Sequence, residues 1–130
     1  MGLDVSHVVP IAKTHAVEQL EYFPVEELSI SPAFIEKHKA LLAEVHDEEA
    51  KVTMTVLYVM EKGYQRKGMS SLFYKDFQNG RPYFDLLSVK KAYEYLKDDH
   101  ISTLEALQQN FQKNFIENFI EGESIFYASW

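Results

Sequence analysis

Residues 52–60, VTMTVLYVM, constrain the fold more than any other stretch of this sequence. β-Branched side chains dominate the run, which favours a β-strand over a helix. The second half of the run is apolar on both faces, and such a strand must be covered from both sides. We therefore expect the fold to be built around residues 52–60 as a central strand.

Further strands are expected toward both ends of the chain. The start alternates in polarity, with Val5 and His7 on one face of a half-buried strand. Residues 16–23 carry a weaker strand pattern. Residues 124–130, SIFYASW, predict a closing strand after Gly122.

Helical spacing of apolar residues occupies most of the remaining chain. The expected helices cover residues 31–46, 70–77, 89–96 and 102–121. Ser31-Pro32 is typical of a helix start, with serine as the cap and proline in the first turn. Ser102-Thr103-Leu104-Glu105 matches a capping box at the start of the longest helix.

This order of elements predicts one α+β domain over residues 1–130. We expect a mainly antiparallel sheet of about four strands with helices on one face. A long C-terminal helix should precede the closing strand. A second domain would leave each half of the 130 residues too small to bury a core.

The composition excludes several kinds of site and location. Cysteine is absent, so disulfides, thiolate metal sites and cysteine nucleophiles are excluded. No apolar run reaches the roughly 18 residues that a membrane-spanning helix requires. Gly2 and Ser6 match a myristoylation pattern, but no polybasic segment follows to add a second membrane signal. We expect an intracellular, soluble and cytoplasmic protein.

The histidines and serines predict neither a metal site nor a catalytic residue. His38 and His46 are more than two turns apart on the expected helix, too far to share one ion. His38 lies on the apolar stripe and is expected to be buried with a hydrogen-bond partner of its own. No serine lies in a nucleophile-elbow sequence.

Charge is segregated along the chain. Residues 1–50 carry 3 basic and 10 acidic side chains, residues 51–91 carry 8 and 3, and residues 92–130 carry 2 and 7, for a net charge of −7. A cationic patch on an anionic body can steer a partner by its local potential. The other interpretation is that the oppositely charged segments neutralise one another after folding. The net charge repels a phosphate backbone, so nucleic-acid binding is not expected.

The cationic middle contains GYQRKGMSSL at residues 63–72, which resembles the acyl-CoA pyrophosphate loop of the GNAT N-acyltransferases. Gln65 and Gly68 match the family pattern, and Ser70 stands where the second small residue belongs. The resemblance implies a pyrophosphate of acetyl-CoA held by the loop amides at a helix start. Its cofactor-binding residues would be Gln65, Arg66, Lys67, Gly68 and Ser70. Tyr93 is the nearest candidate for the family's general acid, whereas the 102–121 helix has no counterpart in that family.

The preferred prediction is a small acidic protein-binding module that acts through its surface, without catalysis or cofactor. One version is an inhibitor or immunity-type protein against a cationic toxin such as a nuclease. The candidate partner-binding residues are Glu48, Glu49, Tyr64, Arg66, Lys67, Arg81, Asp98 and Asp99. In the toxin version the four acidic residues of this set imitate a nucleic-acid backbone. The acyltransferase is the alternative function.

Overall fold

A computed structural model describes residues 3–12, 21–98 and 100–130 of the chain. Gly2 and residues 16–20 of the weak strand prediction lie outside this range. The chain forms two compact units: unit 1 comprises Met1–Val8 and Glu61–Trp130, and unit 2 comprises Val9–Met60. Strands β1 (Asp4–Pro10) and β4 (Val52–Arg66) have residues in both units.

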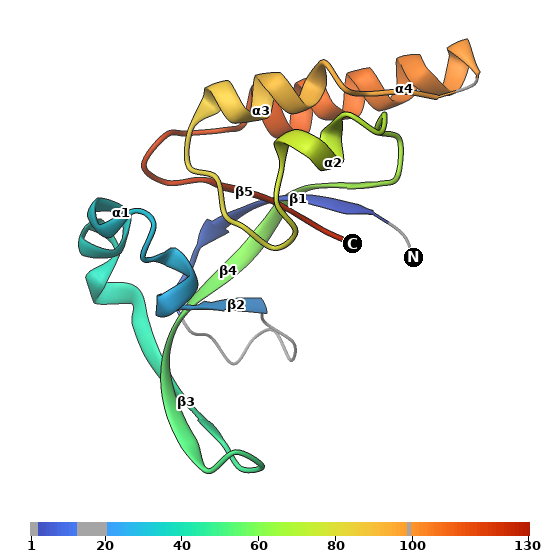
Figure 1. Cartoon of the computed structure of the whole chain (residues 1–130). Helices are drawn as coiled ribbons and strands as arrows, with labels where there is room; N and C mark the ends of the chain where they lie inside the picture. The colour runs from blue at the N-terminus through green and yellow to red at the C-terminus, as the bar shows by residue number, and fades with distance from the viewer. Residues whose placement is uncertain (1–2, 13–20, 99) are drawn as a thin grey trace. The chain divides into compact units, whose positions relative to one another are not determined.

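The strands are ordered β2-β4-β1-β5 in the sheet, and β3 also pairs with β4 (Figure 1). The registers of β1 with β5, β2 with β4 and β3 with β4 are all antiparallel. Helices and strands are not regularly alternated along the chain. The predicted α+β class with a mainly antiparallel sheet is therefore confirmed.

Unit 2 is built on a hairpin. Its elements are β2 (Glu21–Pro24), the 3-10 helix η1 (Val25–Leu28), α1 (Pro32–Lys37), the 3-10 turn η2 (Lys39–Leu41), β3 (Leu42–Asp47) and the first part of β4. Strand β3 pairs with β4 from Leu42 opposite Leu57 to Asp47 opposite Val52. Buried side chains include Leu28, Phe34 and Val56. His38 is buried as expected, with its Nδ1 2.9 Å from the Phe34 carbonyl oxygen.

The helix predicted over residues 31–46 is wrong in its second half. It starts at Pro32 after Ser31 as predicted, but it ends at Lys37, and residues 42–47 form β3. Leu41, Leu42 and Val45 fit helical spacing, but Ala43 and Val45 also alternate with Glu44 and His46 as in a strand. Pairing with the adjacent β4 decides between the two, because a strand there supplies backbone partners for residues 52–57.

Unit 1 packs helices against one side of a strand pair. Its elements are the first part of β1, the end of β4, α2 (Phe73–Asp76), α3 (Leu86–Tyr93), α4 (Ile101–Phe111), the π-helical turn η3 (Gln112–Ile116) and β5 (Ile125–Ser129). Figure 1 shows α2, α3 and α4 on the same side of β1 and β5. Val5 opposite Ala128 and His7 opposite Phe126 turn toward this side. Ser6 and Val8, on the opposite face of β1, are buried too.

An aromatic stripe fixes the long helix on the core of unit 1. Phe111, Phe115 and Phe119 are buried, and the Phe111 and Phe115 rings stack with centroids 4.3 Å apart. The capping-box prediction is wrong, because α4 begins at Ile101 and the Thr103 hydroxyl donates to the His100 carbonyl. The predicted α-helix over 102–121 is instead α4 followed by η3. Gly122 has a left-handed φ of 86°, but it does not end the helix as predicted, because η3 ends at Ile116 and Gly122 lies in the turn before β5. Strand β5 follows as predicted.

Candidate functional site

The predicted loop residues 62–66 belong to the end of β4 and present one exposed face. Lys62, Tyr64 and Arg66 are exposed, whereas Gly63 and Gln65 are buried. Successive side chains of a strand point to opposite faces, so the three exposed residues form a single row. Lys67 follows directly and is also exposed. We call Lys62, Tyr64, Arg66 and Lys67 the β4 strip.

The buried face of this segment fixes the orientation of the strip. A Cβ atom at Gly63 would lie 2.6 Å from the carbonyl oxygen of Asn114 in η3, so only glycine allows this close approach. The side chain of Asn110 donates to the Tyr64 carbonyl at 3.2 Å. Gln65 is 3% exposed and its Nε2 donates to the Lys67 carbonyl at 2.8 Å. The strip is thus held by contacts behind it.

The strip carries positive charge without ion pairs. Among the described residues, Lys62, Arg66 and Lys67 make no ion pair. The Tyr64 hydroxyl donates to Asp4 Oδ1 at 2.6 Å, and this hydrogen bond raises the pKa of Tyr64. Lys67 has a φ of 62°, and its N–H donates to the Leu3 carbonyl at 2.8 Å. The three cations therefore make no direct ion pair within the described chain, although the carboxylates of Asp4 and Glu61 lie near Tyr64 in the same surface.

The strand-to-helix loop predicted from the acyltransferase resemblance is shorter than expected. Gln65 and Arg66 lie within β4, and α2 begins at Phe73 rather than at Ser70. The Lys67 N–H donates to Leu3, and the Ser70 N–H donates to the Tyr95 carbonyl at 2.7 Å. These two amides therefore point at protein carbonyls and are not free to bind a pyrophosphate. Helix α2 has only four residues, too few for an aligned helix dipole.

The structure brings together only part of the predicted partner-binding set. Tyr64, Arg66 and Lys67 lie in the β4 strip. Arg81 is half-buried elsewhere in unit 1, with its guanidinium 5.1 Å from the centre of the Tyr83 ring.

The predicted acidic residues lie in different parts of the chain. Glu48 and Glu49 are exposed in the turn between β3 and β4, where Asp47 Oδ1 accepts the Glu49 N–H at 3.0 Å. Asp98 belongs to unit 1 and accepts the His100 N–H at 3.1 Å. Asp99 lies outside the described residues. Glu48 and Glu49 belong to unit 2, so neither unit by itself contains all three of the described carboxylates.

A buried polar network in unit 1 was not predicted from the sequence. His7 Nδ1 lies 2.9 Å from the Asn114 carbonyl oxygen, and Nε2 lies 2.8 Å from Ser124 Oγ. The carbonyl can only accept, so Nδ1 carries the proton, and Nε2 accepts from the Ser124 hydroxyl. Ser124 Oγ in turn accepts the Ile120 N–H at 3.0 Å. The sequence shows His7 on an apolar face, but its partners are more than 100 residues away.

This histidine–serine pair has a structural role. Hydrolases pair the same groups as base and nucleophile, but a nucleophile must be reached by its substrate. His7 and Ser124 are both 0% exposed. The pair instead satisfies the Asn114 carbonyl near the helix end and the Ile120 N–H in the following turn. Burial is the main cause that lowers the pKa of His7, which keeps the imidazole neutral.

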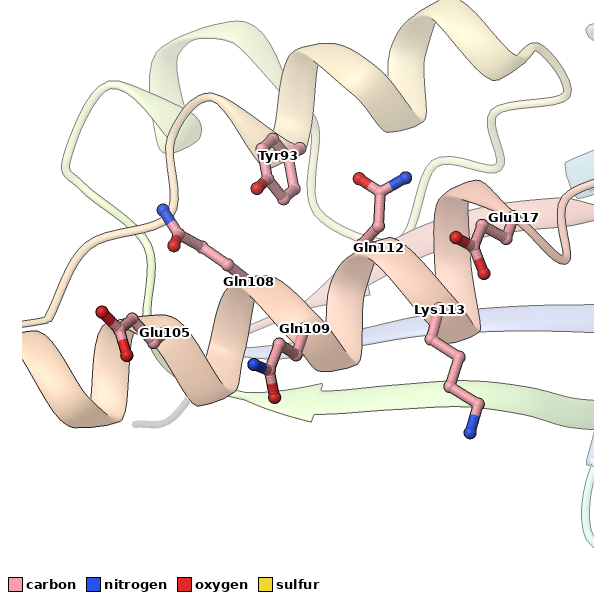
Figure 2. Close-up of a pocket in the computed structure, with 7 residues that line it drawn as sticks. All are labelled: Tyr93, Glu105, Gln108, Gln109, Gln112, Lys113 and Glu117. Carbon is pink, nitrogen blue, oxygen red and sulfur yellow. The ribbon is translucent and has the colours of Figure 1, made fainter.

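A groove lined by residues with polar side-chain ends runs along α4 and η3 on the outside of unit 1 (Figure 2). It has a volume of about 540 Å³. The lining residues are Tyr93, Glu105, Gln108, Gln109, Gln112, Lys113 and Glu117. Figure 2 shows Gln108 and Gln112 on the side of the helix that faces Tyr93 of α3. In the sequence, Gln108 and Gln112 border the phenylalanine stripe on the helical wheel, a position that the pattern does not mark as a site. We call this surface the α4 groove.

Comparison with models of known protein families, with curated proteins and with solved structures finds no match. The geometry of the surfaces is thus the basis for a functional proposal. No helix in the described part of the chain is long and apolar enough to cross a membrane. The described histidine, aspartate and glutamate side chains form no group of three or more that is placed to hold a metal ion.

Proposed function

We propose that this protein is a noncatalytic protein-binding module whose β4 strip contacts an acidic surface of another protein. The supporting observation is that Lys62, Tyr64 and Arg66 are exposed on one face of β4, followed by exposed Lys67, and that the three cations make no ion pair within the described chain. Tyrosine and arginine are among the residue types that most often dominate binding energy at protein interfaces. The strip combines both types with additional positive charge.

Preorganisation adds to the case for this surface. Binding is weakened when side chains and loops must be ordered at the interface. Tyr64 is 45% exposed, yet its hydroxyl is already bound to Asp4 and its backbone carbonyl to Asn110. The close contact of Gly63 with η3 holds the strand itself. Less conformational freedom is then lost when a partner covers the strip.

The inhibitor or immunity-type version of the proposal uses the acidic residues of unit 2. Residues 9–60 contain 9 acidic and 4 basic side chains. Glu48 and Glu49 are exposed at the turn of the β3–β4 hairpin, where a cationic toxin such as a nuclease would meet them. This version makes the acidic hairpin the contact and leaves the β4 strip outside the interface.

The test is affinity capture from the cells that make the protein, followed by measurement of Kd for the captured partner at two salt concentrations. The variants Tyr64→Ala and Arg66→Glu should each weaken binding at least about tenfold, the size of a moderate interface anchor. Lys90→Glu is the matched control, because Lys90 is an exposed cation of unit 1 on α3. Its charge reversal should leave Kd within about twofold.

The outcomes separate the versions of the proposal. Loss of binding only in a double Glu48→Lys and Glu49→Lys variant would move the interface to the hairpin and support the toxin version. Equal binding by the wild type and all these variants, or no captured partner, would remove the support for a binding module. A partner whose affinity falls with salt and with Arg66→Glu is the expected result.

A further inference from the structure

The α4 groove carries a second proposal that does not depend on the β4 strip. Its volume of about 540 Å³ lies within the range of ligand sites in proteins. Its walls expose more apolar than polar area, and three side-chain amides, two carboxylates, one ammonium group and one phenol stand along them. Each amide offers a donor and an acceptor together, as a peptide group does.

The π-helical turn aligns the lining residues into one row. The Gln112 N–H bonds to the Gln108 carbonyl, four residues back. The Glu117 N–H bonds to the Gln112 carbonyl, five residues back, at 2.9 Å. Gln108, Gln112 and Glu117 therefore follow one another along the helix. In an uninterrupted α-helix Ile116 would take the third place, but it packs against the core instead.

The dimensions of this row fit an extended peptide. Gln108 and Gln112 are separated by four residues, about 6 Å along the helix axis. Alternate residues of an extended chain repeat at roughly 6.6 Å, so neighbouring same-side peptide groups can each meet one glutamine. From Glu105 to Glu117 the groove extends roughly 18 Å, which is the length of about six extended residues.

The charges of the lining residues determine which side chains fit at the two ends of such a peptide. Glu105 lies at one end and Glu117 at the other, with the glutamines between them. Lys113 is the single cation of the lining. We propose that the α4 groove binds an extended peptide segment of about six residues, with basic side chains at both ends and uncharged polar residues between.

Two fluorescein-labelled hexapeptide pools test the proposal by fluorescence anisotropy. Both pools are randomised at the four central positions; one has arginine at both ends and the other has glutamate. The net charge of −7 favours the arginine pool everywhere on the protein, so variants must localise the effect. Glu105→Gln and Glu117→Gln should each weaken arginine-pool binding about twofold to fivefold, the usual size of an exposed charge pair.

Glu94→Gln is the matched control, because Glu94 is exposed at the end of α3 and lies outside the lining. It removes the same charge and should leave binding unchanged. Arg66→Glu changes the β4 strip and should not weaken binding, which separates this proposal from the proposed function. Equal binding of the two pools, no binding, or an equal loss in Glu94→Gln would overturn the peptide assignment.

A nuclear magnetic resonance titration gives an independent readout. The side-chain amide signals of Gln108 and Gln112 should shift together with the ring signals of Tyr93 when the arginine pool is added. Shifts confined to residues outside the groove would show that the peptides bind elsewhere, and that result would also refute the proposal.

Discussion

Replacing Ser124 by alanine should destabilise unit 1 strongly for so small a change. The substitution removes one oxygen atom that serves two neighbours. Ser124 Oγ accepts the Ile120 N–H and donates its hydrogen to His7 Nε2. Alanine leaves both groups without this partner. His7 cannot turn to find another one without breaking the 2.9 Å contact of Nδ1 with the Asn114 carbonyl.

The two lost hydrogen bonds differ in their expected effect. The His7–Ser124 contact is fully buried, and an unsatisfied buried acceptor costs about 1–3 kcal/mol. The Ile120–Ser124 contact is only partly buried, so water can replace some of it and we assign it about 1 kcal/mol. The expected loss is therefore about 2–4 kcal/mol, a large share of the roughly 5–15 kcal/mol by which domains are usually stable.

Urea unfolding followed by tryptophan fluorescence measures this loss. Trp130 is the single tryptophan, and it packs against Phe73 and Tyr74 in unit 1. The midpoint should fall while the slope of the transition stays constant. Ser129→Ala is the control, because Ser129 is exposed on the same strand region and should change stability by less than about 0.5 kcal/mol. A Ser124→Ala variant as stable as this control would refute the role assigned to the network.

Three further predictions follow from the same unit. Stability should fall as the pH drops below about 6.5, because burial holds the pKa of folded His7 below that ordinary value and the unfolded chain then binds more protons. A urea midpoint no lower at pH 5.5 than at pH 7.5 would contradict this. The control His46→Gln, at an exposed histidine, should show the same fall in stability. Gly63→Ala should cost about 1–3 kcal/mol through its 2.6 Å clash with the Asn114 carbonyl, whereas Lys62→Ala should cost little in the same unfolding assay. Calorimetric titration with acetyl-CoA should give no heat at moderate salt, because the Lys67 and Ser70 amides already donate to protein carbonyls; salt-resistant binding would restore the acyltransferase alternative.

Local sequence patterns predicted correctly those elements in which the spacing of apolar residues fits only one kind of secondary structure. The β-branched run at residues 52–60 and the phenylalanine stripe are of this kind: β4 contains residues 52–60, and Phe111 and Phe115 are buried on the helix as expected, while Phe119 is buried beyond its end. Residues 42–47 do not belong to this kind, because their apolar positions fit a helix as well as a strand. The choice there is made by pairing with β4, a contact between segments that no local pattern contains.

The same distinction, between local patterns and contacts made by distant segments, explains why the arrangement of the β4 strip was not predicted. Glu61, Lys62 and Gly63 together are typical of a turn, so the sequence predicted that the strand ended at residue 60. In the structure Gly63 is a strand residue whose missing side chain makes room for η3. Glycine inside a strand often marks a site where another backbone approaches closely. Tyr64, Arg66 and Lys67 were identified as candidates from the sequence, whereas the row of Lys62, Tyr64 and Arg66 on one face of β4 depends on that approach.

The π-helical turn links the buried network to the outer groove. The Asn114 carbonyl in this turn accepts from His7 and sets the close contact at Gly63. The extra residue of the same turn puts Glu117 in line with Gln112. A straight α-helix would therefore disturb the inner contacts and would also replace the carboxylate at the end of the α4 groove by Ile116. The proposed peptide site and the stability of unit 1 thus depend on one irregular turn, and a variant that removes it should lose both together.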